Sequence, residues 1–146
     1  MSIKSQTLPK RPTKLYAPSS YWEASAQERA KICNGCGAKK GLDVPDTFYG
    51  LSITSACNIH DWMYQHGETL ADKLFADAIF RLNLTILIDE ANYNFATTIL
   101  KPLRHGRAST YYNAVVLWGE EAFWVKKPKN EVLVITYKGR FEEVGT

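Results

Sequence analysis

The chain has 146 residues, which suits one domain and argues against two. Hydrophobic residues make up 45% and charged residues 23%, a balance that excludes a chain disordered throughout, and no apolar stretch approaches the ~20 residues of a membrane span. The net charge of +3 gathers in the N-terminal segment and in residues 101–140, which suits anionic partners, although on charge alone a solvated basic face is the simpler explanation.

Residues 1–18 contain three prolines and four basic side chains, and they predict an extended basic arm before a single domain at 19–146. Ser20 and Glu23 form a capping-box pattern, so we expect a short helix at about residues 21–31. The glycines that follow predict a loop, and the chain should stay irregular to about residue 53.

The rest of the chain predicts a mostly α-helical fold. A helix begins at Thr54 or Ser55 and ends at Gly67. Another starts near Thr69 and continues towards Pro102 with a break near residues 89–94, and a further helix covers residues 111–125. Residues 131–144 alternate in polarity around Lys138-Gly139, which predicts a short strand or a short C-terminal β-hairpin.

Four polar or reactive side chains share one stripe of the helix at 54–67: Cys57, His60, Asp61 and Tyr64. Histidine can act as a general base near neutral pH. Adjacent helical residues diverge by about 100°, so Asp61 is poorly placed to orient the His60 imidazole and could instead hold a hard cation such as calcium. The glycine-rich loop at 33–41 is the expected source of carbonyl ligands.

His60 needs an acceptor to orient its ring, and the next helix offers Asp72 and Asp77. Asp72 shares the flank of the apolar stripe made by Phe75 and Ile79, whereas Asp77 is aligned with two basic residues and predicts a solvated salt-bridge face. Direction therefore favours Asp72. The positions of the two residues along their helices argue against Asp72, because Asp72 lies only a few residues into its helix and His60 lies about two turns from the end of its own.

A zinc site is the competing interpretation. Cys33 and Cys36, followed by Cys57 and His60, have the spacing of a Cys3His site. It predicts a zinc-stapled or catalytically inactive module that binds nucleic acid or protein, and it gives no role to Asp61, Tyr64 or Asp72.

The segment Cys57-Asn58-Ile59-His60-Asp61-Trp62-Met63-Tyr64 resembles the Cys-x-x-His-Asp-x-x-Tyr helix of the secreted-type phospholipase A2 family, in its minimal bacterial, fungal and viral-capsid forms. Ala71-Asp72-Lys73-Leu74-Phe75 is similar to the Ala-Asp-x-x-Phe pattern that carries the family's dyad aspartate, and Asn34-Gly35-Cys36-Gly37 resembles its calcium loop. The resemblance covers residues 30–82, and the helix motif is its most specific part.

The resemblance implies a phospholipase A2-like core of two antiparallel helices with a calcium loop, extra helices and the C-terminal hairpin. It implies calcium-dependent hydrolysis of the sn-2 ester of glycerophospholipids. His60 would deprotonate water, Asp72 would hold the imidazole, and Tyr64 would hydrogen-bond Asp72.

The resemblance also implies the metal ligands and a disulfide. Ca²⁺ would be held by Asp61 and by loop carbonyls at Asn34, Gly35 and Gly37. A disulfide between Cys36 and Cys57 would tie the loop to the helix, as it does in several family members.

A phospholipid membrane interface is the expected partner, and no nucleic acid is expected. The expected lipid-contacting surface combines three aromatic side chains with three lysines: Trp118, Phe123, Trp124, Lys126, Lys127 and Lys129. No secretory signal is readable in the basic N-terminus, so we expect an enzyme made in the cytoplasm and then released, or carried in a particle as the viral-capsid members are.

Overall fold

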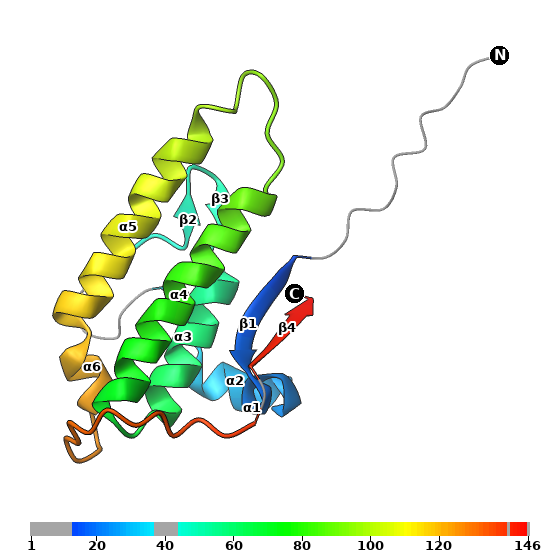
Figure 1. The fold of residues 1–146 in the computed structure, drawn as a ribbon. Coiled ribbons are helices and arrows are strands. Elements are labelled where there is room, and N and C mark those ends of the chain that lie inside the picture. Colours follow the sequence, from blue (N-terminus) through cyan, green and yellow to red (C-terminus); the bar gives the residue numbers. More distant parts are fainter. Residues whose placement is uncertain (1–12, 37–43, 140, 146) are drawn as a thin grey trace.

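The structure is a computed structural model that describes residues 13–36, 44–139 and 141–145. It is a mostly helical small domain, in agreement with the predicted fold class (Figure 1). The elements follow in the order β1 (Lys14–Pro18), α1 (Ser19–Glu23), α2 (Ala26–Ile32), β2 (Thr47–Phe48), β3 (Leu51–Ser52), α3 (Thr54–His66), α4 (Leu70–Glu90), α5 (Leu100–Trp118), α6 (Glu120–Trp124) and β4 (Phe141–Gly145).

Helix α4 is the centre of the domain, because it packs against α3, α5 and β1 (Figure 1). The His60 ring packs on Phe80, whereas the later Tyr64 ring packs on the earlier Lys73, so α3 and α4 run in opposite directions after a three-residue turn. Helices α4 and α5 also run in opposite directions, because Arg81 lies over the Tyr112 ring whereas the later Asp89 bonds to the earlier His105. The two helix pairs are therefore antiparallel.

Both principal predicted helix starts lie where the sequence places them. Helix α3 begins at Thr54, after Ile53 rather than a capping side chain, and ends before Gly67. Helix α4 begins after Thr69, whose hydroxyl accepts the Asp72 amide while the Asp72 carboxylate accepts the Thr69 amide. This reciprocal pair satisfies two amides that the first helical turn leaves without partners.

The short N-terminal helix differs from the prediction. The capping box is formed by Ser25 and Glu28 instead of Ser20 and Glu23, and it starts a separate helix, α2. The Ser20 hydroxyl is used elsewhere, since it accepts a hydrogen bond from Trp62 Nε1 at 3.2 Å.

The predicted break after α4 is confirmed, but the next helix begins earlier than residue 111. Helix α5 starts at Leu100 and passes through Pro102. Proline is tolerated there because it lies in the first turn, where the missing N–H would have had no helical acceptor. Gly119 then separates α5 from α6, so residues 111–125 do not form one helix.

The predicted C-terminal hairpin is wrong. Residues 131–139 lie outside any helix or strand, and β4 pairs antiparallel with β1, placing Lys14 opposite Gly145 and Pro18 opposite Phe141. The upstream segment instead bonds to the start of α4, through Leu70 N–H to the Asn130 carbonyl and Ala71 N–H to the Val132 carbonyl. Of the predicted arm, residues 1–12 lie outside the described part, and residues 14–18 form β1.

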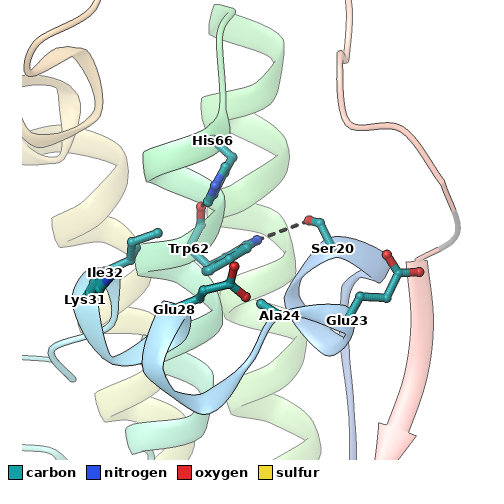
Figure 2. A pocket seen from close by; sticks show the side chains of 8 residues that line it. All are labelled: Ser20, Glu23, Ala24, Glu28, Lys31, Ile32, Trp62 and His66. Carbon is teal, nitrogen blue, oxygen red and sulfur yellow. Dashed lines mark hydrogen bonds between the residues drawn. The ribbon is translucent and has the colours of Figure 1, made fainter.

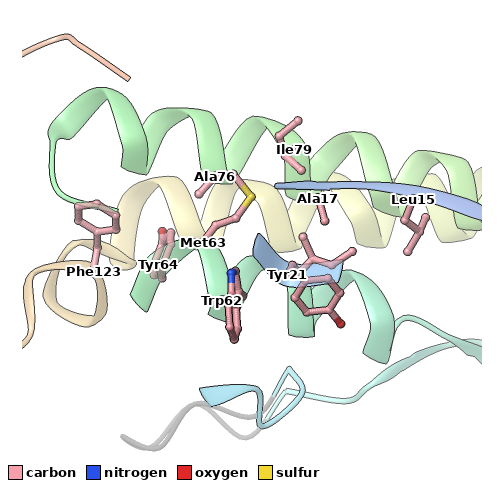
Figure 3. Packing of buried hydrophobic residues seen from close by; sticks show 10 residues of the cluster. Leu15, Ala17, Tyr21, Trp62, Met63, Tyr64, Ala76, Ile79 and Phe123 are labelled. Carbon is pink, nitrogen blue, oxygen red and sulfur yellow. The ribbon is translucent and has the colours of Figure 1, made fainter. Parts of the chain in front are cut away.

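Two apolar clusters hold the helices together. One joins β1 and α1 to α3, α4 and α6, as Figure 3 shows for Leu15, Tyr21, Met63, Ile79 and Phe123. The other lies under the β2–β3 hairpin, which is the second two-stranded sheet. None of the described helices is long and apolar enough to cross a membrane.

Candidate active site

His60 and Asp77 meet in the buried interface between α3 and α4. His60 Nε2 lies 2.8 Å from Asp77 Oδ1, and the two residues are 7% and 1% exposed. The imidazole packs against Phe80 and Tyr64, with ring centroids 4.7 and 4.1 Å away. These contacts fix both the position and the plane of the ring.

Two further side chains hold the Asp77 carboxylate. The Tyr64 hydroxyl donates to Oδ1 at 2.7 Å, and the Lys73 ammonium donates to Oδ2 at 2.8 Å. Burial alone would raise the pKa of Asp77, but the hydrogen bonds and charges of His60, Lys73 and Tyr64 outweigh it and lower the pKa. Burial beside Asp77 raises the pKa of Tyr64, so the hydroxyl keeps its proton and donates.

The ionised carboxylate decides how His60 is protonated. A carboxylate can only accept, so Nε2 must carry a hydrogen, and in the neutral imidazole Nδ1 then keeps its lone pair. No hydrogen bond joins Nδ1 to another described residue. The ring is therefore arranged to accept a proton at Nδ1 while Nε2 stays bound to Asp77.

Asp77 takes the place predicted for Asp72, so that prediction is wrong. Ala78 and Leu82, which keep helical spacing with Phe75 and Ile79 in the sequence, are exposed, whereas Lys73, Ala76 and Asp77 are buried. The face was misjudged because α4 is covered by α5 as well as by α3, so residues that a two-helix picture leaves in solvent are enclosed. Asp77 also lies deeper along α4, level with His60.

The sequence did contain a signal for Asp77. The pattern Ala-Asp-x-x-Phe occurs twice in α4, once at Ala71–Phe75 and again at Ala76-Asp77-Ala78-Ile79-Phe80. Only the second copy lies opposite His60, where its Phe80 also packs on the imidazole.

Asp72 has a structural role instead. Its carboxylate accepts the amides of Glu68 and Thr69, and both the amide and the hydroxyl of Thr136. These hydrogen bonds outweigh the opposing effect of burial and lower the pKa of Asp72. Asp72 thus joins the start of α4 to the C-terminal segment and makes no contact with His60.

Asp61 and the loop at Asn34 and Gly35, which carry most of the predicted metal ligands, lie next to each other. Asp61 lies beside the loop, where its Oδ2 accepts the Asn34 amide at 3.1 Å, and the neighbouring Asn58 side chain accepts the Gly35 amide at 3.0 Å. Gly37 lies outside the described residues. Calcium prefers carboxylate and carbonyl oxygens; Asp61 supplies one carboxylate, but the loop meets it through an amide hydrogen rather than a carbonyl oxygen.

The Cys36–Cys57 disulfide is present and joins this loop to α3, with Cα atoms 5.1 Å apart. It uses two of the four ligands required by the Cys3His zinc site, and Asp77 engages His60 Nε2. Cys33 is the free cysteine, and burial and the nearby Asp61 raise the pKa of its thiol to about 11. Within the described ranges, no three His, Cys, Asp or Glu side chains are grouped to hold a metal.

The expected lipid-contacting surface is only partly exposed. Trp118 is 72% exposed, but Phe123 is fully buried in the core. Lys127 donates to the carbonyls of Tyr64 and Gly67 at the end of α3, and Lys129 pairs with Glu120. Trp118 remains available for lipid contact, whereas Phe123 and Lys127 serve the fold.

A shallow depression lies on another face of α3, between that helix and the α1–α2 segment (Figure 2). Trp62 and His66 line it together with Glu28 and Lys31. Trp62 is two residues from His60 and therefore points to a different side of the helix, so this depression is separate from the His60–Asp77 pair.

Comparisons of this chain with protein-family models, with curated proteins and with solved structures found no match.

Proposed function

We propose that the chain is a calcium-dependent, phospholipase A2-like esterase that hydrolyses the sn-2 ester of glycerophospholipids. The observation that carries the proposal is the His60–Asp77–Tyr64 arrangement, with Asp61 next to the loop that the disulfide fixes on α3. In this interpretation α3 and α4 are the antiparallel core pair of the family, and Asp77 is the dyad aspartate.

The chain's own residues account for proton transfer. His60 Nδ1 takes a proton from water as the oxygen attacks the ester carbonyl, and the imidazolium returns the proton to the departing alcohol oxygen. Asp77 keeps Nε2 protonated, holds the ring plane and stabilises the positive charge. Tyr64 restrains the carboxylate oxygen that faces His60.

The metal would be held by Asp61 with backbone oxygens of the loop that contains Asn34 and Gly35, and Gly37 is a proposed further ligand. Bound Ca²⁺ would offset the negative charge of the substrate phosphate and of the reacting carbonyl oxygen. The proposed partner is a phospholipid surface, contacted through exposed apolar side chains that include Leu117 and Trp118.

Hydrolysis of phosphatidylcholine–phosphatidylglycerol vesicles, measured as fatty-acid release, tests the proposal. We expect activity that requires calcium, that chelator removes and added calcium restores, and that magnesium does not support, because magnesium demands tighter octahedral geometry and keeps its waters. His60→Asn should lose at least about 10²-fold, the usual contribution of general-base catalysis. The half-buried His105, away from this site on α5, provides the matched control, His105→Asn, which should be unchanged.

Asp61→Asn tests the metal ligand in the same assay. It should weaken calcium binding and hydrolysis together, whereas Asp89→Asn, an exposed carboxylate on α4, should alter neither. Calcium-independent hydrolysis, or retention of more than about a tenth of the activity by His60→Asn, would contradict the proposal.

A further inference from the structure

Lys73 is buried in the same interface as the His60–Asp77 pair. It is 3% exposed, and its Nζ lies 2.8 Å from Asp77 Oδ2 and 3.2 Å from the Val115 carbonyl of α5. Lysine is almost never buried this deeply unless its charge is paired. The position therefore has a specific partner, and that partner is the carboxylate that holds the proposed base.

The two oxygens of Asp77 are used differently. Oδ1 accepts from His60 and Tyr64, and Oδ2 accepts from Lys73. A carboxylate anchored at only one oxygen can turn about its side-chain torsion. The ammonium removes that freedom, since it holds Oδ2 from the opposite side while its second bond fixes it to α5.

The charges point the same way. Without Lys73, a carboxylate that is 1% exposed would face a neutral imidazole and a phenol, and the cost of burying its charge would favour protonation. A protonated Asp77 could donate to Nε2, which would select the wrong tautomer of His60. The neighbouring ammonium removes this alternative.

We propose that Lys73 is a positioning residue for the hydrolytic reaction: through Asp77 it keeps the carboxylate charged, oriented and aligned on His60 Nε2, and it links this alignment to α5. The inference rests on the proposed function for its catalytic consequence, but its structural part concerns the His60–Asp77 hydrogen bond itself. Lys73 contacts Asp77 and Val115 rather than the Nδ1 side of the imidazole, so it is not a catalytic residue.

Lys73→Met tests this inference, since methionine keeps the length of the side chain and removes the charge. We expect kcat on phospholipid vesicles to fall about 10²-fold with KM unchanged, the scale of loss that misplacement of a catalytic group produces. The proton NMR resonance of the hydrogen-bonded His60 Nε2–H should shift or disappear. Lys101→Met, which removes an exposed ion pair with Asp89, is the control and should change neither quantity.

A double-mutant cycle separates positioning from general support of the fold. Because Lys73 acts through Asp77, adding Lys73→Met to Asp77→Asn should lower kcat by less than about twofold, although each single change is severe. All rates are compared well below the melting temperature of each variant. If Lys73→Met does not fold, Lys73→Arg replaces it, and the retained charge should preserve the Nε2–H resonance.

The outcomes distinguish this inference from the proposed function. A lower melting temperature for Lys73→Met with kcat and the Nε2–H resonance unchanged overturns the positioning role, and so does full additivity in the cycle. If the wild-type protein hydrolyses no phospholipid, the proposed function fails. In that case, the His60 Nε2–H resonance of Lys73→Met still tests whether Lys73 aligns Asp77 on His60.

Discussion

Asp72 and Asp77 show how the surroundings of a residue, rather than its type, determine its role. Both lie on α4, both are buried, and both have a lowered pKa. Asp72 accepts mainly from backbone amides and Thr136, so its charge serves a helix start. Asp77 accepts from a histidine, a lysine and a tyrosine, so its charge lies beside the proposed base.

Replacing each aspartate by asparagine should separate these roles. Asp77→Asn should lower hydrolysis by at least about 10²-fold, because an amide can donate to Nε2 and select the wrong imidazole tautomer. Asp72→Asn should lower the stability by about 0.5–2 kcal/mol, the usual range for loss of a helix cap, and leave kcat nearly unchanged. Vesicle hydrolysis and thermal unfolding of both variants are the measurements, and the opposite pattern would restore the pairing of His60 with Asp72.

Sequence spacing was sufficient to place His60, Asp61 and Tyr64 on one helix, because helical periodicity fixes the positions of residues within one helix. It was insufficient for Asp77 and Lys73. Their burial depends on the third helix, α5, which packs on the side of α4 that a two-helix pattern leaves in solvent.

At the scale of elements, the junction between α5 and α6 packs directly on the site. A Cβ added at Gly119 would overlap the Tyr64 hydroxyl and the Val115 carbonyl, the acceptor of Lys73. The absence of a side chain at this position lets α5 approach the Asp77 cluster.

Gly119→Ala should therefore destabilise the protein by about 1–3 kcal/mol, the range for overpacking, and reduce hydrolysis as Tyr64 is displaced. Gly106 lies inside α5, and a Cβ added there would meet no atom within 4 Å, so Gly106→Ala should stabilise the protein by about 0.5–1 kcal/mol through helix propensity. Chemical unfolding measures both changes. Equal effects of the two substitutions would refute the steric role of Gly119.

The link from α4 to the C-terminal segment should respond to acid. Hydrogen bonds lower the pKa of Asp72 in the folded protein, so its contribution to stability is complete above the ordinary aspartate value of about 3.9 and is lost as pH falls through the lower folded value. The melting temperature of wild type should exceed that of Asp72→Asn most near pH 6–7, and the gap should close below about pH 4. A gap that is constant from neutral to acidic pH would contradict this assignment.

The predicted boundaries of helices agree with the observed ones where local capping and chain termination determine them. Thr69 with Asp72, and Gly67, mark the α3–α4 turn by capping and termination alone. The alternating residues near the C-terminus have the pattern of a hairpin, but Asn130 and Val132 find backbone partners at the start of α4, and β4 finds its partner in β1. Those pairings join segments far apart in the chain, and no local pattern contains them.

At the scale of the whole molecule, a single asparagine attaches the N-terminal strand to the helices. Asn83 is fully buried in α4, and its side chain accepts the Tyr16 amide and donates to the Tyr16 carbonyl, both at 2.8 Å. The amide of Asn83 thus acts towards β1 as a neighbouring strand would. It satisfies the backbone on the edge of β1 that β4 does not cover.

Asn83→Leu keeps the volume but removes both hydrogen bonds. We expect a loss of about 1–3 kcal/mol for each Tyr16 backbone group left buried without a partner, and faster amide exchange in β1. Asn113→Leu, at an exposed position on α5, should stay within about 0.5 kcal/mol of wild type. Hydrogen exchange and denaturant unfolding measure both effects, and an undiminished stability of Asn83→Leu would show that β1 is held by packing alone.

The pairing of β1 with β4 also determines how this domain can be combined with other chains. Lys14 and Gly145 are register partners on adjacent strands, so the polypeptide enters and leaves the described fold at one place (Figure 1). A short peptide could join the two strands into a closed ring, with new ends opened in the exposed segment between α4 and α5. By the same geometry, the domain could be inserted into a surface loop of a host protein without forcing the two sides of that loop apart.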